Sequence, residues 1–407
     1  MAPYHITVLP ARYDQGMRTI HFLAPLCFFM LPVAVVAQDD LPPGAQGLDL
    51  PYFWAYDPPS TLVVPQHEVT HAKYPFVDVH NHQWNMNDQD LDQLVHEMDK
   101  LNMAVLVNLS GRGGRRIEQP DGSIRFGIGP PDHLSAVLEN VHAHAAKRFA
   151  VFTNLDFEGI GQEGWTEHAV TQLRADVAAG ANGLKIYKSL GMDVRDAAGK
   201  RVAVNDPRLD AVWTVCGELG IPVLIHTADP APFWLPKDAN NERFYELIQR
   251  PERYRDPASN PPFERLIAEQ HAVFRGHPQT VFINAHFGWM ANDLGRLGRL
   301  LDALPNVYVE FGAIIAELGR QPRFAHDWFV RYQDRILFGK DTWRPSEYPT
   351  YFRLLETADE YFPYFRRRHA FWRIYGLDLP DEVLRKVYYK NALRILPGLD
   401  PSLFPSD

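Results

Sequence analysis

Short apolar runs alternate with amphipathic stretches over most of the chain. Eight of these runs are rich in the β-branched and aromatic residues that favour strands, and they occupy residues 76–80, 103–110, 149–156, 182–189, 221–227, 280–288, 306–313 and 335–343. Stretches between them, such as 90–102 and 209–220, repeat apolar residues with the period of a helix. The strand interiors are apolar throughout, as in parallel strands that are covered on both faces. Eight strands alternating with helices over about 270 residues predict a (β/α)8 TIM barrel, an α/β fold.

An open, doubly wound sheet is the alternative architecture for this alternation. A glycine-rich phosphate-binding turn after the first strand would favour it, and the sequence has none at that position. Two connections are too long for plain turns, residues 228–264 after the fifth strand and residues 344–376 after the eighth. Both follow carboxyl ends of strands, where barrel enzymes build their sites, so we expect these loops to cover a pocket. Residues 380–398 predict a closing amphipathic helix.

The first 37 residues have the features of a secretory signal. The stretch "MRTIHFLAPLCFFMLPVAVVAQDD" has an arginine, an apolar core and small residues before its polar end. Translation starts at Met1 or, in our interpretation, at Met17. An uncleaved membrane anchor is the alternative, but Pro25 and Pro32 interrupt a run that is barely long enough to span a bilayer. We therefore expect an exported protein, periplasmic or secreted, with no stable membrane association after cleavage.

The remaining chain divides into three parts. Residues 38–72 form a proline-rich extension, residues 73–397 form the barrel, and residues 398–407 form a tail. With 407 residues, 46% of them hydrophobic, the chain can bury a large core. A net charge of -9 without a long basic block argues against a nucleic-acid partner and favours a small molecule. A homodimer is the oligomeric state that we expect by default.

Two histidines at the end of the first strand are candidate metal ligands. In "FVDVHNHQW" the pleat of a strand places His80 and His82 on one face together with Asp78. The pair His142 and His144 has the same spacing, but it lies in a helical pattern, where residues two apart point in different directions. Only the first pair is therefore predicted to share an ion.

Further polar residues stand at the ends of other predicted strands. Lys185 lies in the fourth strand, while His226, His286 and Asp341 end the fifth, sixth and eighth. In a barrel these ends converge at one mouth, so residues far apart in sequence meet there. Imidazole and carboxylate ligands suit one divalent ion, for which we expect zinc, with manganese or iron as alternatives. A water bound to such an ion becomes a hydroxide nucleophile near neutral pH.

The chain resembles the amidohydrolase superfamily over residues 73–397, in particular its amidohydrolase-related, metal-dependent branch. The matching pieces are "VDVHNH", "VLIHTADP", "INAHFGW", "ILFGKDTW" and "NALRILPG". The resemblance implies metal ligation by His80, His82, His226 and Asp341, with His286 as the catalytic histidine beside the metal. Lys340 departs from the small or hydroxyl residue that is expected before the aspartate, and we expect its side chain to point away from the mouth.

Some members of this superfamily carboxylate a lysine of the fourth strand so that it bridges two metals. Lys185 occupies that position, although a pocket cation that pairs with an acid or with the substrate is the alternative reading. We expect one metal ion.

The predicted reaction is hydrolysis of a carbonyl-derived bond, such as a lactone, ester or amide, in a small molecule. Asp341 can accept the proton of the attacking water, and His286 can bind a developing oxyanion or act as acid or base. Metal-dependent decarboxylation of a small carboxylic acid uses the same ligands and is the rival enzymatic function. A noncatalytic metabolite-binding barrel is a third alternative, but such a protein is expected to lose some of the five residues, and all are present.

Weaker signals suggest residues for substrate binding. Arg112 lies in the glycine- and arginine-rich stretch "SGRGGRR" after the second strand, which can cradle an anion or simply be solvated. Trp84 and Trp343 follow strand ends and can line a pocket or pack in the core. Arg320 and Arg344 are candidates for a substrate carboxylate, with surface ion pairs as the alternative.

Overall fold

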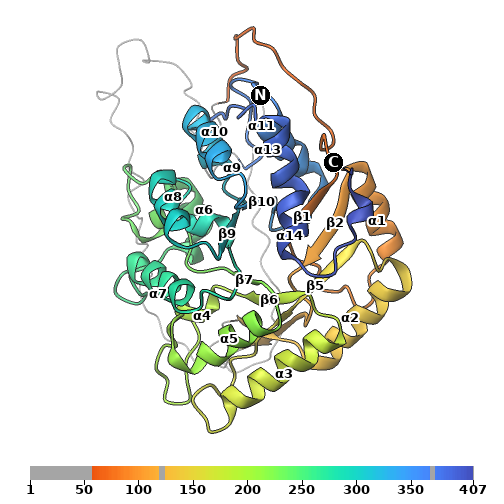
Figure 1. Cartoon of the computed structure of the whole chain (residues 1–407). Coiled ribbons are helices and arrows are strands. Elements are labelled where there is room, and N and C mark those ends of the chain that lie inside the picture. The colour runs from red at the N-terminus through yellow and green to blue at the C-terminus, as the bar shows by residue number, and fades with distance from the viewer. Residues whose placement is uncertain (1–56, 119–123, 367–371, 407) are drawn as a thin grey trace, which may run out of the picture. The chain divides into compact units, whose positions relative to one another are not determined.

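The computed structural model describes residues 57–118, 124–366 and 372–406 (Figure 1). Residues 63–407 form one compact unit, which holds all helices and strands of the described residues. The predicted signal over residues 1–37 lies outside these residues, so export stays a prediction. Within the described residues, no helix is both long and apolar enough to cross a membrane.

Eight strands form one parallel sheet, and each pairs with the next in the order β1-β2-β5-β6-β7-β8-β9-β10. Every one falls inside a run that the sequence predicted as a strand, except that β1 extends one residue further, to Asn81. Their bounds are Phe76–Asn81, Met103–Asn108, Phe149–Asn154, Gly183–Ile186, Val223–Ile225, Phe282–Asn284, Val307–Glu310 and Ile336–Leu337. The (β/α)8 TIM barrel is thereby confirmed, and the open doubly wound alternative is wrong.

Two backbone hydrogen bonds join the first strand to the last and so close the barrel. The N–H of Val79 donates to the Phe338 carbonyl at 2.9 Å, and the N–H of Asp341 donates to the His80 carbonyl at 2.6 Å. Strand β10 is only two residues long, yet these contacts carry the pairing beyond it to residue 341. The two ends of the sheet therefore meet at His80 and Asp341.

Helices follow most of the strands and cover the outside of the barrel (Figure 1). The longer ones are α1 Leu91–Lys100, α2 Pro131–His144, α3 Trp165–Ala179, α5 Asp210–Glu218, α7 Phe263–Gly276, α8 Leu294–Ala303, α10 Pro322–Arg331 and α11 Tyr348–Glu356. Helix α1 illustrates why they form: Asp90 caps it by accepting from Gln93 N, and Leu91, Leu94 and Met98 are buried along one face.

Shorter elements complete the fold. They are the helices α4 Ser189–Met192, α6 Phe244–Gln249, α9 Ile315–Gly319, α13 Asp381–Arg385 and α14 Asn391–Ile395, a π-helical segment Lys386–Lys390, and the 3-10 turns Pro207–Leu209, Ala231–Trp234, Pro251–Arg253, Ala285–Trp289, Pro345–Glu347 and Pro401–Leu403. Residues 381–395 are helical without a break, which confirms the predicted closing helix. It buries Val383, Val387 and Tyr388.

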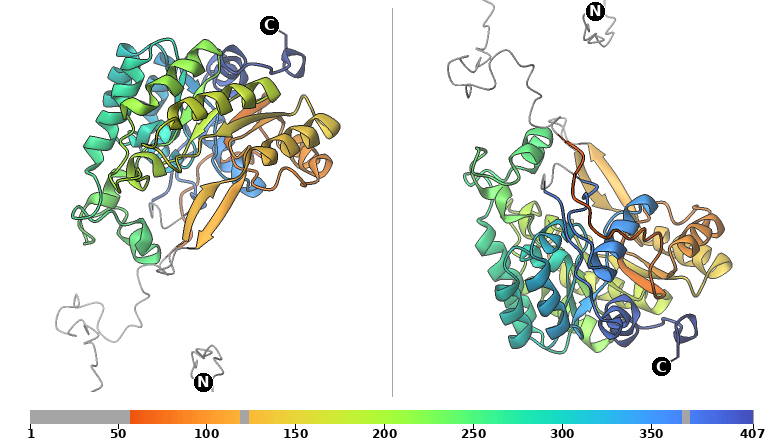
Figure 2. Two further views of the ribbon diagram at one scale, coloured as in Figure 1. Left: turned by 90° about the horizontal axis from the view of Figure 1, so that it is seen from below. Right: turned by 90° about the horizontal axis from the view of Figure 1, so that it is seen from above.

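The two long connections carry structure of their own. Residues 228–264 contain two 3-10 turns and α6 before α7 begins, and residues 344–376 contain a 3-10 turn and α11. The connection after β2 differs from the sequence prediction of a loop. It forms an antiparallel hairpin of β3 Gly114–Glu118 and β4 Ile124–Ile128, which extends away from the barrel (Figure 2).

Candidate metal centre

The end of β1 and the segment after β10 bring three predicted ligands together. Asp341 Oδ1 lies 3.4 Å from His80 Nε2 and 3.6 Å from His82 Nε2. One ligand atom from each of these residues lies within 4.8 Å of the others, a spacing at which the three can hold a metal ion. Asp341 has a positive φ of 86°, a conformation that aspartate tolerates better than most residues and that here directs its carboxylate toward the histidines.

A second group of possible ligands shares His80 and adds two buried residues. His80, His286 and Glu310 also each place a ligand atom within 4.8 Å of the others. His286 stands at the end of β8 with a φ of 55°, and its ring centroid lies 4.9 Å from that of His80. The carboxyl ends of β1, β8 and β9 therefore converge with the segment after β10 at one place.

Hydrogen bonds fix which nitrogen of each imidazole is available. His80 Nδ1 lies 2.8 Å from a carboxylate oxygen of Glu310, and His286 Nδ1 lies 2.7 Å from the Gly312 carbonyl. Because neither oxygen can donate, both Nδ1 atoms carry the proton, and each Nε2 keeps its lone pair. His82 Nδ1 lies 2.7 Å from Ser110 Oγ. This arrangement is typical of metal-binding histidines, whose other nitrogen is held by a carboxylate, carbonyl or hydroxyl.

The surroundings of His226 show whether a metal ion fits this site. Its ring centroid lies 4.5 Å from that of His286, and its Nε2 is buried without a hydrogen-bond partner among the described residues. Buried polar atoms are nearly always partnered, so this nitrogen calls for a ligand that the described part of the chain does not supply. A divalent cation bound by the neighbouring histidines and Asp341 would satisfy it, and the donor set fits such an ion.

Lys185 lies in the same cluster. Its Nζ is 3.4 Å from His80 Nε2 and 5.6 Å from the centre of the Tyr187 ring. Burial lowers the pKa of Lys185 to about 8, partly offset by the nearby carboxylates of Asp341 and Glu310. The ammonium is therefore close to the lone pairs that would bind an ion, which agrees with its predicted place in the pocket.

The electrostatics of the site favour the protonation states that metal binding needs. Burial lowers the pKa of His82 to about 3, with a further contribution from Lys185. For Asp341, burial raises the pKa, but the surrounding imidazoles of His80, His286 and His82 outweigh it and bring the pKa down to about 2. At neutral pH the site thus offers neutral imidazole nitrogens and an ionised carboxylate.

Lys340 points away from this cluster, as the sequence analysis predicted. Its Nζ donates to Glu347 Oε2 at 2.6 Å and to the Thr342 carbonyl at 2.8 Å, and it lies over the Tyr348 ring. The charge of Lys340 is therefore neutralised by Glu347, and the lysine does not compete with Asp341 for a place at the barrel mouth.

Sequence reasoning missed Glu310, the carboxylate at the end of β9. It is fully buried and accepts hydrogen bonds from His80 Nδ1, from the N–H of His286 at 2.7 Å and from the N–H of Gly312 at 2.6 Å. The signal was present in "NVYVEFGA", where an acid ends an apolar strand. The rule that identified His226 and His286 by their place at strand ends applies equally to this residue.

Among the candidates for substrate binding, Trp84 lies beside the cluster. Its ring stacks on that of His82 at a centroid distance of 5.3 Å and an angle of 9°, and 44% of the residue is exposed. Arg112 is buried instead, where it donates to the carbonyls of Gly129 and Asn154. It lines a cavity of about 220 Å³ between β5 and α3.

The other three candidates have contacts elsewhere. Trp343 donates to Glu97 Oε2 at 3.3 Å, and Arg320 donates to Glu242 Oε2 at 3.0 Å. Arg344 is exposed just before the turn Pro345–Glu347. Arg320 therefore forms an ion pair, which was the alternative to substrate binding in the sequence analysis. None of these three side chains forms a hydrogen bond with the histidines among the described residues.

Several solved structures are similar to this chain, whereas no curated protein matches it. A putative amidohydrolase from Staphylococcus aureus is 15% identical, with 79% of this chain and 99% of that chain covered and a TM-score of 0.47. Dihydroxybenzoic acid decarboxylase from Polaromonas sp. JS666, with bound manganese and the inhibitor 2-nitroresorcinol, is 13% identical, with coverages of 79% and 96% and a TM-score of 0.47. An amidohydrolase from Burkholderia multivorans with bound zinc is 14% identical, with coverages of 79% and 100% and a TM-score of 0.44.

A family model also matches most of this chain. The model described as amidohydrolase matches residues 77–398, a range that includes all five predicted centre residues. The chain therefore belongs to the amidohydrolase family.

Proposed function

We propose that this chain is a metal-dependent hydrolase that cleaves a lactone, ester or amide bond in a small molecule. Membership of the amidohydrolase family supports an enzyme that acts on a small molecule. The observation that carries the proposal is the convergence of His80, His82 and Asp341 on one point, with His286 beside them. His80 and His82 lie at the end of β1, His286 follows β8 and Asp341 follows β10. The centre is therefore assembled from the ends of separate strands at one mouth of the barrel.

The ligands of the ion would be His80, His82, His226 and Asp341. The unpartnered, buried Nε2 of His226 supports its inclusion in this set. Zinc is the ion that we expect, with manganese or iron as alternatives, because imidazole and carboxylate donors suit all three. When bound, a divalent ion polarises a carbonyl oxygen and lowers the pKa of a water toward neutrality.

Asp341 and His286 would move the protons. The carboxylate of Asp341 is ionised at neutral pH and accepts a proton from the attacking water, which it then returns to the leaving group. The Gly312 carbonyl holds the Nδ1–H of His286, so the neutral ring presents Nε2 as an acceptor. His286 would therefore act as a base for the second proton of the attacking water, which is released when the carboxylic acid product ionises, and would pass that proton to solvent, while the leaving group receives its proton from Asp341.

Glu310 and Lys185 would act around this pair. Glu310 holds His80 and the backbone of His286 in place, so it is a positioning residue. Lys185 provides a positive charge 3.4 Å from His80 Nε2, where it can attract a substrate carbonyl or carboxylate oxygen.

The test is a direct comparison of two reactions on the purified protein loaded with zinc or with manganese. Acid release from lactones and aryl esters is followed by pH-stat titration, amine release from amides is followed with an amine-reactive dye, and carbon dioxide release is followed for aromatic and aliphatic acids. We expect acid release that disappears on removal of the metal by a chelator. Carbon dioxide release without acid release would replace the proposal with decarboxylation. Tight ligand binding with neither product would support a noncatalytic barrel.

A further inference from the structure

A chain of hydrogen bonds leads from His82 to a tyrosine at the end of another strand. His82 Nδ1 lies 2.7 Å from Ser110 Oγ, and Ser110 Oγ lies 3.1 Å from the hydroxyl of Tyr187. That hydroxyl lies in turn 3.1 Å from the carbonyl oxygen of Leu109. Because His82, Ser110 and Tyr187 follow β1, β2 and β6, this hydroxyl chain spans the ends of three strands.

The carbonyl of Leu109 determines the direction of every hydrogen bond in the hydroxyl chain. A carbonyl oxygen can only accept, so the Tyr187 hydroxyl uses its single hydrogen for it. Tyr187 can then only accept from the Ser110 hydroxyl, and Ser110 can only accept from the ring of His82. Three contacts thus use three hydrogens, one from each side chain. His82 must therefore carry its proton on Nδ1.

The opposite direction would leave two oxygen atoms in contact without a hydrogen between them. If Ser110 donated to His82 Nδ1, Tyr187 would have to donate to Ser110. The oxygens of Tyr187 and Leu109 would then face each other at 3.1 Å with no hydrogen to bridge them. The arrangement of the groups therefore favours the direction that ends at Nδ1–H.

Asn108, the last residue of β2, fixes both ends of the contact between His82 and Ser110. Its Oδ1 accepts from the N–H of Ser110 at 2.9 Å and from the N–H of Gln83 at 3.0 Å. Its Nδ2 donates to the Gln83 carbonyl at 3.1 Å. Since Gln83 directly follows His82, one buried amide holds the backbone of the histidine and that of its partner. The serine is thereby kept at a fixed place beside the ring.

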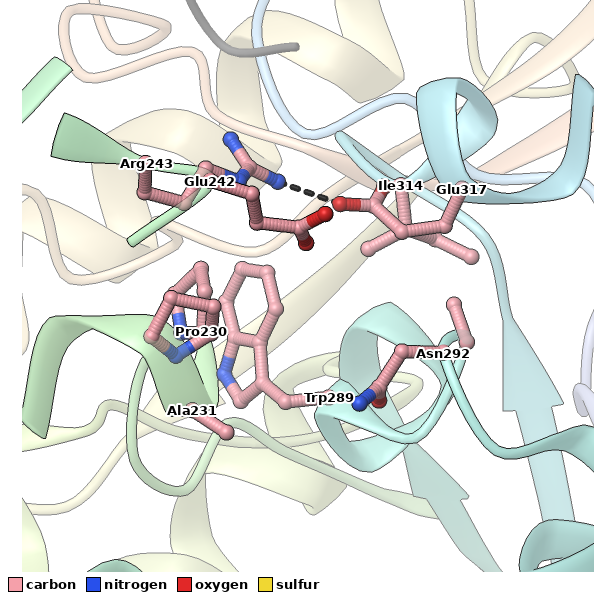
Figure 3. A pocket seen from close by; sticks show the side chains of 10 residues that line it. Pro230, Ala231, Glu242, Arg243, Trp289, Asn292, Ile314 and Glu317 are labelled. Atoms are coloured by element: carbon pink, nitrogen blue, oxygen red, sulfur yellow. Dashed lines mark hydrogen bonds and ion pairs between the residues drawn. The ribbon is translucent and has the colours of Figure 1, made fainter. Parts of the chain in front are cut away.

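His226, another predicted ligand, has no comparable chain of hydroxyl groups among the described residues. Its ring lies 5.7 Å from that of Trp289, and the indole Nε1 of this tryptophan is itself without a partner in the described part of the chain. Figure 3 shows Trp289 beside Pro230 and near the ion pair of Arg243 with Glu317. The hydroxyl chain is therefore a feature of one predicted ligand and not of the whole barrel mouth.

We propose that Tyr187 and Ser110 are positioning residues that hold His82 in the Nδ1–H tautomer and so keep the lone pair of its Nε2 available to a metal ion. The inference rests on the proposed function only in taking an ion as the ligand of this lone pair. His82 Nε2 lies 3.6 Å from Asp341 Oδ1, and a carboxylate attracts a proton to the nearer nitrogen. The hydroxyl chain opposes that attraction by holding the proton on the other nitrogen.

The tautomer of His82 in the metal-free protein tests this role without requiring an ion. The protein is prepared with isotope-labelled histidine, and its imidazole nitrogens are observed by long-range proton–nitrogen NMR at about pH 8, where free imidazoles are neutral. The signals of His82 are those missing in His82→Gln. We expect a protonated Nδ1 in the parent protein. In Tyr187→Phe we expect a shift toward a protonated Nε2, because the Ser110 hydroxyl is then free to donate to Nδ1. An unchanged tautomer in Tyr187→Phe would overturn the proposal.

Tyr388→Phe is the matched control for the loss of a tyrosine hydroxyl. Tyr388 is buried in the closing helix, and its hydroxyl donates to Glu356 Oε1 at 2.6 Å. We expect this variant to keep the parent tautomer of His82. The same shift in Tyr388→Phe as in Tyr187→Phe would reflect a general loosening of the fold and would refute a specific role of Tyr187.

Zinc affinity shows whether the two residues act as one chain. We expect Tyr187→Phe and Ser110→Ala each to bind zinc about tenfold more weakly than the parent protein, measured by competition with a chromophoric chelator. The double variant should bind no more weakly than Ser110→Ala alone, because Tyr187 acts through Ser110. Losses that add in the double variant would contradict this dependence.

The two measurements distinguish the hydroxyl chain from the proposed function. If the tautomer shifts as expected but neither the parent protein nor its variants bind zinc, the positioning role remains and the metal-dependent reaction is lost. If all variants bind zinc as tightly as the parent and keep its tautomer, the metal centre remains and the positioning role is lost.

Discussion

Glu310 accepts a hydrogen bond from His80 Nδ1 at 2.8 Å, although 230 positions separate the two residues in the chain. The same carboxylate also accepts from the backbone N–H of His286. One acid therefore fixes the ring of a predicted ligand and the backbone of the predicted catalytic histidine. Such carboxylate–histidine contacts set the tautomer of the ring and raise its basicity as a ligand.

Replacement of this acid by its amide tests that role. We expect Glu310→Gln to bind zinc about 10–100-fold more weakly, because an amide orients the His80 ring less well and does not raise its basicity. The dissociation constant is measured by competition with a chromophoric chelator. Glu269→Gln is the control, since Glu269 is also buried but pairs with Arg201 outside the barrel mouth. An unchanged zinc affinity in Glu310→Gln would remove the positioning role.

Asp341→Asn should lower kcat by at least about 100-fold, because the amide cannot take up the proton of the attacking water. Turnover of the best substrate and the thermal unfolding midpoint are measured on the same preparation. Asp378→Asn is a suitable control, since Asp378 is exposed and has a positive φ of 49°, comparable with the 86° of Asp341. Full activity of Asp341→Asn would contradict its assignment as the base.

His226→Ala should reduce the zinc that survives dialysis to well below one ion per chain. The variant loses the imidazole whose Nε2 has no partner among the described residues, so a proposed ligand is removed without breaking a hydrogen bond at that nitrogen. Zinc is quantified by mass spectrometry after dialysis. His142→Ala controls for the loss of a histidine, because His142 is exposed in the last turn of α2. Equal zinc contents in the two variants would show that His226 is not a ligand.

Lys185→Ala should leave about one zinc ion per chain, because we expect the lysine to be a pocket cation and not a bridge between two ions. Metal content is measured on both proteins purified under identical conditions in the presence of bicarbonate. A content near two ions in the parent protein that falls in Lys185→Ala would establish the two-metal centre instead.

The stability of the fold should depend on His271 of α7 in mildly acidic solution. Burial, followed by the charges of Arg296 and Arg275, lowers the pKa of His271 from 6.5 to about 4. As the pH falls through this interval the unfolded chain takes up a proton before the folded one, so the free energy of unfolding decreases. Relative to His271→Gln, the parent protein should lose on the order of 2 kcal/mol between about pH 7 and pH 4.

Urea denaturation at a series of pH values measures this difference. Comparison of the two proteins at each pH cancels the contribution of the histidines at the barrel mouth, which both retain. A difference that stays constant with pH would mean that His271 titrates alike in the folded and unfolded states.

The sequence predicted the barrel because parallel strands buried on both faces must be apolar, and that property is visible without a structure. It also predicted that His80, His226, His286 and Asp341 meet, because strand order alone brings carboxyl ends to one mouth. The sequence could not predict the contacts of Arg112 and Arg320. Their partners Asn154 and Glu242 belong to other segments, and tertiary packing decides whether those segments lie beside the arginines. The sequence contained a signal for the β3–β4 hairpin in the residues Pro-Asp-Gly at 120–122, a combination typical of turns, but the flanking residues are polar and indicated a loop.

The barrel closes where the segment after β10 returns to β1, through the hydrogen bond from Asp341 N to the His80 carbonyl. His80 and Asp341, two proposed ligands of a single ion, thus lie on opposite sides of the junction between the first and the last strands to be synthesised. The complete ligand set does not exist until residue 341 has been synthesised and has left the exit tunnel. A metal ion held by these two residues would therefore bind only after the last strand is in place, and it would tie the end of the sheet to its beginning.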